Sequence, residues 1–327
     1  MGEQGFQKFE ADRAVLPPAV EVYPVQGVRG KPAVVLPVVL FICTVFTTLL
    51  AGVFLQLGFL LQAGQSIPTL RLSSFLDPQT WLLGAPFSIA LLAILLAHEM
   101  GHFLMCRHYG IDATYPYVIP APPMLNFFGT FGAVIRIKSP FGNPTELFDV
   151  GIAGPIAGFV VLVPALLIGL KLSTPLHGKL TEGVMEFGEP LLFKWSSTLV
   201  FYSTDVNINL HPIGWAAWFG ILATSINLLP IGQLDGGHVV YALFGPRAHR
   251  WVSRITFVSI IALAVATTRL LSVYLVFALV LLFLLGLRHP APLRDDTRID
   301  RGRFLLAVFG LVILVITFMP IPVRVIS

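Results

Sequence analysis

Charged residues are scarce in this 327-residue chain. Asp, Glu, Lys and Arg together make up 12% of the sequence, whereas 56% is hydrophobic. A soluble domain carries roughly 25% charged residues, so the chain has too few polar side chains to cover a water-facing surface. The apolar residues also gather in long stretches. This composition excludes an ordinary soluble domain and predicts an all-α, multi-pass membrane protein in contact with a lipid bilayer.

Cysteine is almost absent as well. Cys43 and Cys106 both fall in apolar segments, where thiols are usually inert packing residues, and one distant pair provides no disulfide framework. Nor does the chain contain a basic patch interleaved with aromatic residues, although its net charge is +4. Nucleic acid is therefore excluded as an expected partner.

The first 32 residues lack an apolar core and carry several acidic side chains. They match neither a cleavable signal peptide nor a transit peptide, so we expect residues 1–32 to form a cytoplasmic tail. No segment connecting the later apolar stretches reaches the roughly 50–200 residues of a separate domain. Residues 33–327 are therefore expected to form a single membrane-embedded domain.

Seven apolar segments are long enough, or nearly so, to cross a membrane. They are residues 33–55, 82–106, 150–170, 213–229, 251–267, 270–287 and 304–319. With the N-terminus inside and all seven crossing, 15 of the 21 Lys and Arg residues would lie on the cytoplasmic side. The positive-inside rule favours this orientation, and we expect a bacterial cytoplasmic membrane.

The segment between the second and third spans has a different pattern. Residues 111–138 contain four prolines, and Val134, Arg136 and Lys138 alternate with apolar residues at strand period. Bare strand edges cannot face lipid. The pattern fits an ordinary cytoplasmic hairpin and equally a re-entrant β-hairpin whose free edge pairs with an unwound substrate.

The second span contains the string Ala97-His98-Glu99-Met100-Gly101-His102. Side chains four residues apart lie on one face of a helix, so His98 and His102 can chelate one zinc ion. Glu99 then stands beside the site as a candidate general base. Ionisable side chains at this depth indicate function unless they have partners; a set of hydrogen-bonded polar residues at a helix end is the alternative.

A zinc site of this kind needs a third protein ligand. Asp235 follows the fourth span in a stretch where Pro230, Gly236 and Gly237 interrupt the helix. Irregular backbone at membrane depth belongs around a cavity. Alone, Asp235 would be taken as a turn residue; beside two histidines that lack a third ligand, it is the candidate.

Other polar and small residues are assigned structural roles. Gly154 and Gly158 have the spacing that lets helices approach closely, with Pro155 adding a kink. His211 and His238 are interpreted as structural or as neighbours of the ligands, and His108 as an interfacial residue. His177, His249 and His289 are placed in loops without a functional signal.

These motifs resemble the site-2 protease family of intramembrane zinc metalloproteases. The resemblance rests on His98–His102, on Asn227, Pro230 and Leu234-Asp235-Gly236, and on Gly154-Pro155-Ile156-Ala157-Gly158. It covers about residues 82–240, the expected catalytic core, and is greatest to the short bacterial and chloroplast branch. The chain has no room for the PDZ domain that many members carry.

The resemblance implies one Zn²⁺ per chain held by His98, His102 and Asp235, with Glu99 as general acid and base. It also implies that Asn227 binds substrate backbone or stabilises the oxyanion, and that the substrates are transmembrane proteins. Two alternatives stay open, a metal or ion transporter and an inactive membrane scaffold. A transporter would spread polar residues over several helices, and a dead homologue would have lost a ligand or the base.

Overall fold

The computed structural model describes residues 34–66, 71–176, 185–203, 207–267, 292–293 and 299–325. The helices are α1 (Val35–Gln62), η1 (Leu72–Leu76, 3-10), α2 (Pro78–His108), α3 (Pro144–Leu172), α4 (Leu191–Phe201), α5 (Pro212–Leu228), α6 (Asp235–Thr267) and α8 (Arg301–Thr317). The strands are β1 (Tyr117–Pro120), β2 (Thr130–Val134), β3 (Thr174–Pro175), β4 (Met185–Phe187), β5 (Ile208–Asn209) and β6 (Val323–Val325). They form three two-stranded antiparallel sheets, β1-β2, β3-β5 and β4-β6.

Four of the described helices are long and apolar enough to cross a membrane: α1, α2, α3 and α6. α5 and α8 have 17 residues each, fewer than the roughly 20 that a perpendicular span needs. The predicted segment 270–287 lies outside the described residues. A mostly helical membrane protein with small antiparallel sheets is therefore confirmed, whereas the count of seven spans is not.

α6 differs from the sequence-based prediction. The sequence predicts a separate span at 251–267, but the helix that contains these residues already begins at Asp235. Gly245 has φ 77° and ψ 179° and is followed by Pro246. Since a positive φ favours glycine and proline cannot continue a helical hydrogen-bond ladder, this pair divides α6 into two halves, 235–244 and 246–267.

Side-chain caps set the starts of α2 and α3. Asp77 accepts a hydrogen bond from the Gln79 N–H at 2.9 Å, and Asn143 accepts one from the Glu146 N–H at 3.0 Å. A proline, which lacks an N–H, follows each cap, the arrangement expected at a helix start. Both helices therefore begin several residues before the apolar segments predicted at 82 and 150.

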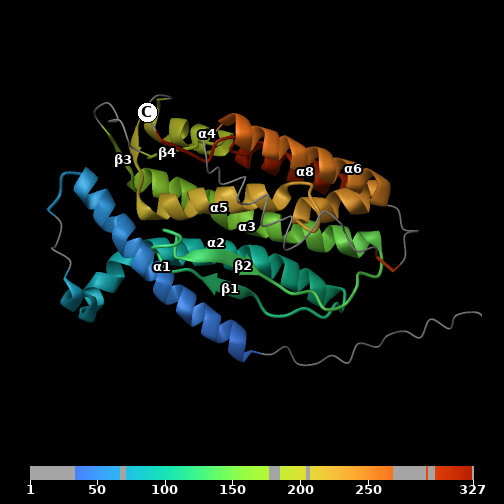
Figure 1. Ribbon diagram of the computed structural model, residues 1–327, viewed down its shortest axis with the longest axis horizontal. Coiled ribbons are helices and arrows are strands. Elements are labelled where there is room, and N and C mark those ends of the chain that lie inside the picture. Colours follow the sequence, from blue (N-terminus) through green and yellow to red (C-terminus); the bar gives the residue numbers. More distant parts are fainter. Residues whose placement is uncertain are drawn as a thin grey trace, which may run out of the picture. The chain divides into compact units, whose positions relative to one another are not determined.

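α2, α3 and α5 pack together at the centre of the fold (Figure 1). Leu91, Leu162 and Ile221, one from each helix, are fully buried in the same apolar cluster. The turn of α2 that contains Gly101 approaches α3 so closely that a Cβ there would lie 2.5 Å from the Ala153 carbonyl oxygen. This contact brings the histidine-bearing part of α2 against α3.

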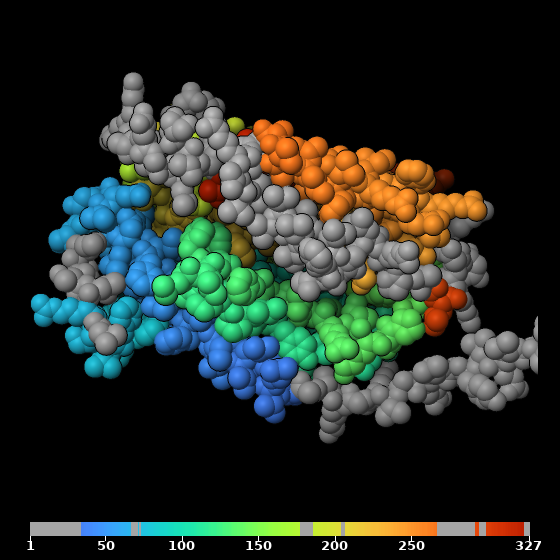
Figure 2. All heavy atoms as spheres, viewed as in Figure 1, coloured from blue at the N-terminus to red at the C-terminus, as the bar shows by residue number. Residues whose placement is uncertain are grey.

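The hairpin β1-β2 is anchored to α1. Thr44 donates a hydrogen bond to the Val118 carbonyl at 2.9 Å, and Thr47 donates one to the Gly129 carbonyl at 2.7 Å. The space-filling view shows the green atoms of the hairpin region directly beside the blue atoms of α1 (Figure 2). β2 ends at Val134, and beyond it Ile137 forms an isolated bridge with Ala113. The predicted β-hairpin is therefore present, although its regular strand is shorter than the alternating pattern.

An ion pair ties α8 to the start of α3. The Arg303 guanidinium contacts both oxygens of Asp149, at 2.8 and 2.6 Å, and also pairs with Asp300. The Tyr109 hydroxyl donates to Asp149. Burial and the neighbouring Asp149 carboxylate raise the pKa of Tyr109 above its ordinary value, so the hydroxyl stays protonated as a donor.

Arg303→Ala should destabilise the fold because it leaves the partly buried Asp149 carboxylate without its charged partner. We expect a loss of about 1–3 kcal/mol, seen as a lower melting temperature of the purified protein in detergent. The control is Arg301→Ala, since Arg301 lies two residues earlier on the same helix and is exposed. Equal melting temperatures for the two variants would contradict this role.

Candidate metal centre

Two buried histidines and a half-buried aspartate, from two separate parts of the chain, meet beside α3. His98 and His102 lie one turn apart on α2, and Asp235 is the first residue of α6. His98 Nε2 is 3.2 Å from Asp235 Oδ2 and 3.2 Å from His102 Nε2, and His102 Nε2 is 3.4 Å from Asp235 Oδ1. Both histidines are 6% exposed. The structure thus brings together the three side chains that the sequence predicts as metal ligands.

These separations fit a zinc ion. Zinc bonds to imidazole nitrogen and carboxylate oxygen are about 2.0–2.2 Å long, and tetrahedral angles then place the ligand atoms roughly 3.3–3.5 Å apart. The distances among His98, His102 and Asp235 agree with that spacing. Among the described residues, His98, His102 and Asp235 form the one group of three or more His, Cys, Asp or Glu side chains whose ligand atoms lie close enough to hold a metal ion.

The His102 ring is oriented by α3. Its Nδ1 lies 2.7 Å from the Val150 carbonyl oxygen, which can only accept a hydrogen bond, so Nδ1 carries the proton. The lone pair of a neutral ring then resides on Nε2, the atom that faces His98 and Asp235. A backbone carbonyl that fixes the tautomer in this way is the usual companion of a metal-binding histidine.

A break between α5 and α6 places Asp235. α5 ends at Leu228, a turn follows, and α6 starts at Asp235 itself. The turn is tight: Leu234 N–H donates to the Ile231 carbonyl at 3.0 Å, and a Cβ at Gly236 would lie 2.0 Å from the Leu228 carbonyl oxygen. The interruption predicted from Pro230 and the glycines is therefore present, and the first residue of the new helix reaches the two histidines.

Glu99 is buried next to the histidine ligands. It is 6% exposed and follows His98 directly on α2. Glu99 and Ile135, the residue after the end of β2, line one cavity. The candidate base thus lies beside the hairpin.

Asn227 comes from the last turn of α5. Its side-chain nitrogen lies 3.3 Å from His98 Nε2. The amide therefore stands beside the ligand cluster, where it can reach a group bound there.

Gly154 and Gly158 line the α3 side of the cluster. A Cβ at Gly154 would lie 2.0 Å from His102 Nε2, and one at Gly158 would lie 3.1 Å from the Cβ of His98. Their predicted packing role thus acts directly on the two histidines. α3 continues through Pro155 without a break.

A cavity of about 600 Å³ opens at the cluster. His98, Glu99, His102, Asn227 and Asp235 line one part of it. The rest is formed by the end of β2 and the residues after it, by the turn before α6, and by His238. The cavity therefore joins the candidate base and ligands to the hairpin.

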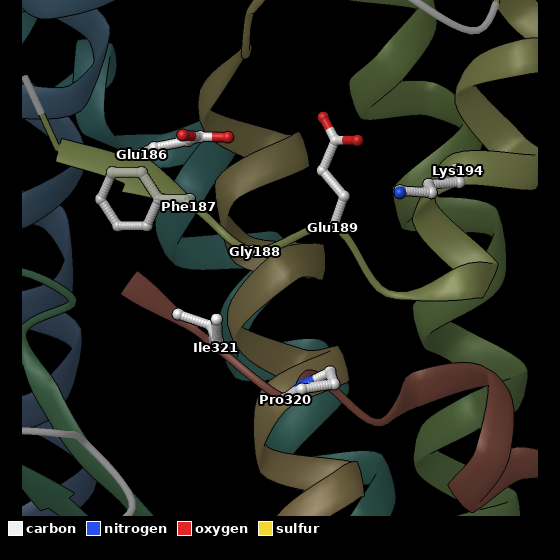
Figure 3. A pocket seen from close by; sticks show the side chains of 7 residues that line it. All are labelled: Glu186, Phe187, Gly188, Glu189, Lys194, Pro320 and Ile321. Atoms are coloured by element: carbon white, nitrogen blue, oxygen red, sulfur yellow. The ribbon is translucent and has the colours of Figure 1, made fainter. Parts of the chain in front are cut away.

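A second cavity, of about 310 Å³, lies between β4, α4 and the segment before β6 (Figure 3). The carboxylates of Glu186 and Glu189 and the amine of Lys194 project from its rim (Figure 3). It contains no histidine or cysteine among its lining residues. Its composition therefore does not match a zinc site.

The remaining histidines lie in different environments. His211 caps α5 by accepting a hydrogen bond from the Ile213 N–H at 3.3 Å, and burial lowers the pKa of His211, which keeps that nitrogen unprotonated. His108 is exposed at the end of α2, while His238 lines the large cavity. The loop assignment of His249 is wrong, because this residue lies within α6 and is 1% exposed. His177 and His289 lie outside the described residues.

Comparison with known proteins points to one family. A family model described as "Peptidase family M50" matches residues 86–270. "Probable zinc metalloprotease EGY1, chloroplastic" of Arabidopsis thaliana is 30% identical over 244 residues, which cover 72% of this chain and 43% of the relative. "Probable zinc metalloprotease EGY2, chloroplastic" of the same plant is 28% identical over 265 residues, covering 79% and 46%. The chain therefore spans less than half the length of these relatives.

Gly154→Ala should abolish metal binding, because the added methyl group would occupy the position of the His102 ring edge. We expect the purified variant to contain less than about a tenth of the wild-type metal, since misplacing a ligand ring also breaks its bond to Val150. Gly58→Ala on α1 is the matched control, as a Cβ there meets nothing within 4 Å. Wild-type metal content in Gly154→Ala would show that the contact is not restrictive.

Proposed function

The chain belongs to peptidase family M50, and from that premise we propose that it is an intramembrane zinc metalloprotease. It hydrolyses peptide bonds in or near the transmembrane segments of membrane-anchored proteins. The observation that carries this proposal is the approach of His98, His102 and Asp235 to 3.2–3.4 Å of one another, a spacing that suits ligands of one zinc ion. Glu99 follows His98 directly on α2. The relatives, each named "Probable zinc metalloprotease", support it.

His98, His102 and Asp235 would hold one Zn²⁺ per chain. When bound, zinc acidifies a water molecule and polarises the carbonyl of the peptide to be cut. The chain itself would supply two imidazole nitrogens and a carboxylate, the three protein ligands typical of a catalytic zinc site, and these side chains line the cavity.

Glu99 acts as general base and then as general acid. Its carboxylate takes a proton from the attacking water and later delivers that proton to the nitrogen of the leaving amine. Its side chain lines the cavity that His98, His102 and Asp235 also line. Such proton transfer contributes typically about 10²–10⁴-fold to a rate.

Asn227 stabilises the developing oxyanion or holds the substrate backbone. Its side-chain amide lies beside His98, and a donor placed where negative charge develops is worth about 10²–10³ in kcat. The role depends on the amide group, since a shorter apolar side chain at this position would leave the site without that donor.

The hairpin offers a docking edge for the substrate. β2 pairs with β1 on one side, and its last residues, Ala133 and Val134, line the catalytic cavity. A transmembrane helix must unwind before cleavage because its amides are closed within the helix. The edge of β2 supplies backbone hydrogen-bonding groups to such an unwound segment, in line with the second interpretation of the predicted hairpin.

Several finer features of the proposal rest on the sequence. They are seven membrane crossings, a cytoplasmic N-terminus supported by the distribution of Lys and Arg, and a cavity that opens toward the cytoplasm. The prediction of a bacterial membrane has no support from the relatives, whose names are chloroplastic. Neither the family match nor the relatives favour a transporter or an inactive scaffold.

Glu99→Gln should leave zinc bound and reduce cleavage by at least about 100-fold, because the amide keeps the shape of the side chain but cannot take the proton. Zinc is measured by mass spectrometry of the purified protein and cleavage with a model membrane-anchored substrate. His98→Ala serves as the contrasting variant, since it should lose both zinc and cleavage. Retained turnover in Glu99→Gln would remove the proposed base.

Asn227→Ala should retain zinc while kcat falls by about 10²–10³-fold. A larger change in kcat than in KM is expected if the amide acts on the transition state. Unchanged kcat together with a raised KM would instead assign Asn227 to binding of the substrate backbone alone.

A further inference from the structure

The turn before Asp235 is buried at Leu229, Ile231 and Gly232, and its buried backbone polar groups need hydrogen-bond partners. Residues 229–234 join α5 to α6, and Ile231 is 1% exposed. An unpaired buried N–H or C=O costs about 1–3 kcal/mol. The position of Asp235 therefore depends on which groups bond to this turn.

Two side chains from the second half of α6 provide these bonds. Ser253 Oγ accepts a hydrogen bond from the Gly232 N–H at 3.0 Å and donates one to the Pro230 carbonyl at 3.3 Å. His249 Nε2 donates to the Gly232 carbonyl at 3.0 Å. Gly232, which has φ 51°, is thus held at both its N–H and its C=O.

Both side chains are among the most deeply buried polar groups of the described chain. His249 is 1% exposed and Ser253 is 0% exposed. They stand four residues apart and so share one face of α6, and the interruption at Gly245 and Pro246 separates this half of α6 from the half that begins with Asp235. The first half of α6 therefore provides the candidate ligand Asp235. The second half provides the two side chains that bond to the turn before Asp235.

We propose that His249 and Ser253 are positioning residues for the metal centre. By holding Pro230 and Gly232, they fix the turn three residues before Asp235 and keep its carboxylate within bonding distance of the metal held by His98 and His102. This inference rests on the proposed zinc ligands. It assigns a role in the site to a histidine and a serine that contact neither metal nor substrate.

Cobalt binding to the purified, metal-stripped full-length protein tests the proposal. Tetrahedral Co²⁺ absorbs visible light with an intensity that depends on its ligands, so a titration reports both affinity and geometry. We expect Ser253→Ala and His249→Leu to weaken Co²⁺ binding by about 10–100-fold, the usual effect of losing a group that supports a ligand, and to alter the visible spectrum. His249→Gln, which retains an N–H donor, should restore much of the affinity.

Ser173→Ala is the matched control for the loss of a buried hydroxyl. Ser173 also accepts a backbone hydrogen bond, from the His211 N–H at 2.9 Å, and donates one, to the Gly169 carbonyl at 2.7 Å. It lies at the end of α3 opposite to Val150. We expect Ser173→Ala to lower the melting temperature of the metal-free protein about as much as Ser253→Ala does, but to leave the cobalt spectrum and affinity unchanged.

Two results would overturn the inference. Wild-type cobalt affinity and spectrum in Ser253→Ala and in whichever His249 variants fold would refute the positioning role, provided that Asp235→Ala loses cobalt. If Asp235→Ala itself binds cobalt as the wild type does, the proposed ligand set fails and the positioning role fails with it. The Asp235→Ala variant therefore separates failure of this inference from failure of the proposed function.

Discussion

The structure depends on the cost of placing ionisable side chains inside an apolar helical protein. His98, His102 and Asp235 are largely removed from solvent, and an isolated charge at such depth is strongly unfavourable. They become tolerable because they face one another at distances that suit a shared cation. The arrangement of α2, α3 and the start of α6 brings these three side chains together.

α3 supports this arrangement in two ways, through a missing side chain and through a backbone carbonyl. The absence of a side chain at Gly154 leaves space for the His102 ring, while the Val150 carbonyl one turn earlier fixes its tautomer. Asp149, adjacent to Val150, is bound by Arg303 of α8. The orientation of His102 is thus linked to the packing of α8 against α3. Contacts that take no part in the proposed reaction therefore help to hold a proposed metal ligand in place.

The sequence allowed the three candidate ligands of this site to be predicted, but not the residues that support them. His98 and His102 are four residues apart on one helix, so their shared face follows from helical geometry alone, and Asp235 could be singled out because few carboxylates remain at membrane depth. His249 and Ser253 carry no such signal: they matter through bonds to a turn about 20 residues earlier, which only the folded chain reveals. The same limit explains α6, where the sequence predicted a span that starts at residue 251, although the helix begins at Asp235 and is interrupted at Gly245.

X-ray absorption at the zinc edge of the purified wild-type protein tests the central claim most directly. The account predicts one zinc per chain with two imidazole nitrogens and at least one oxygen at about 2.0–2.2 Å. A spectrum without imidazole scattering, or a protein that takes up no zinc, would contradict it.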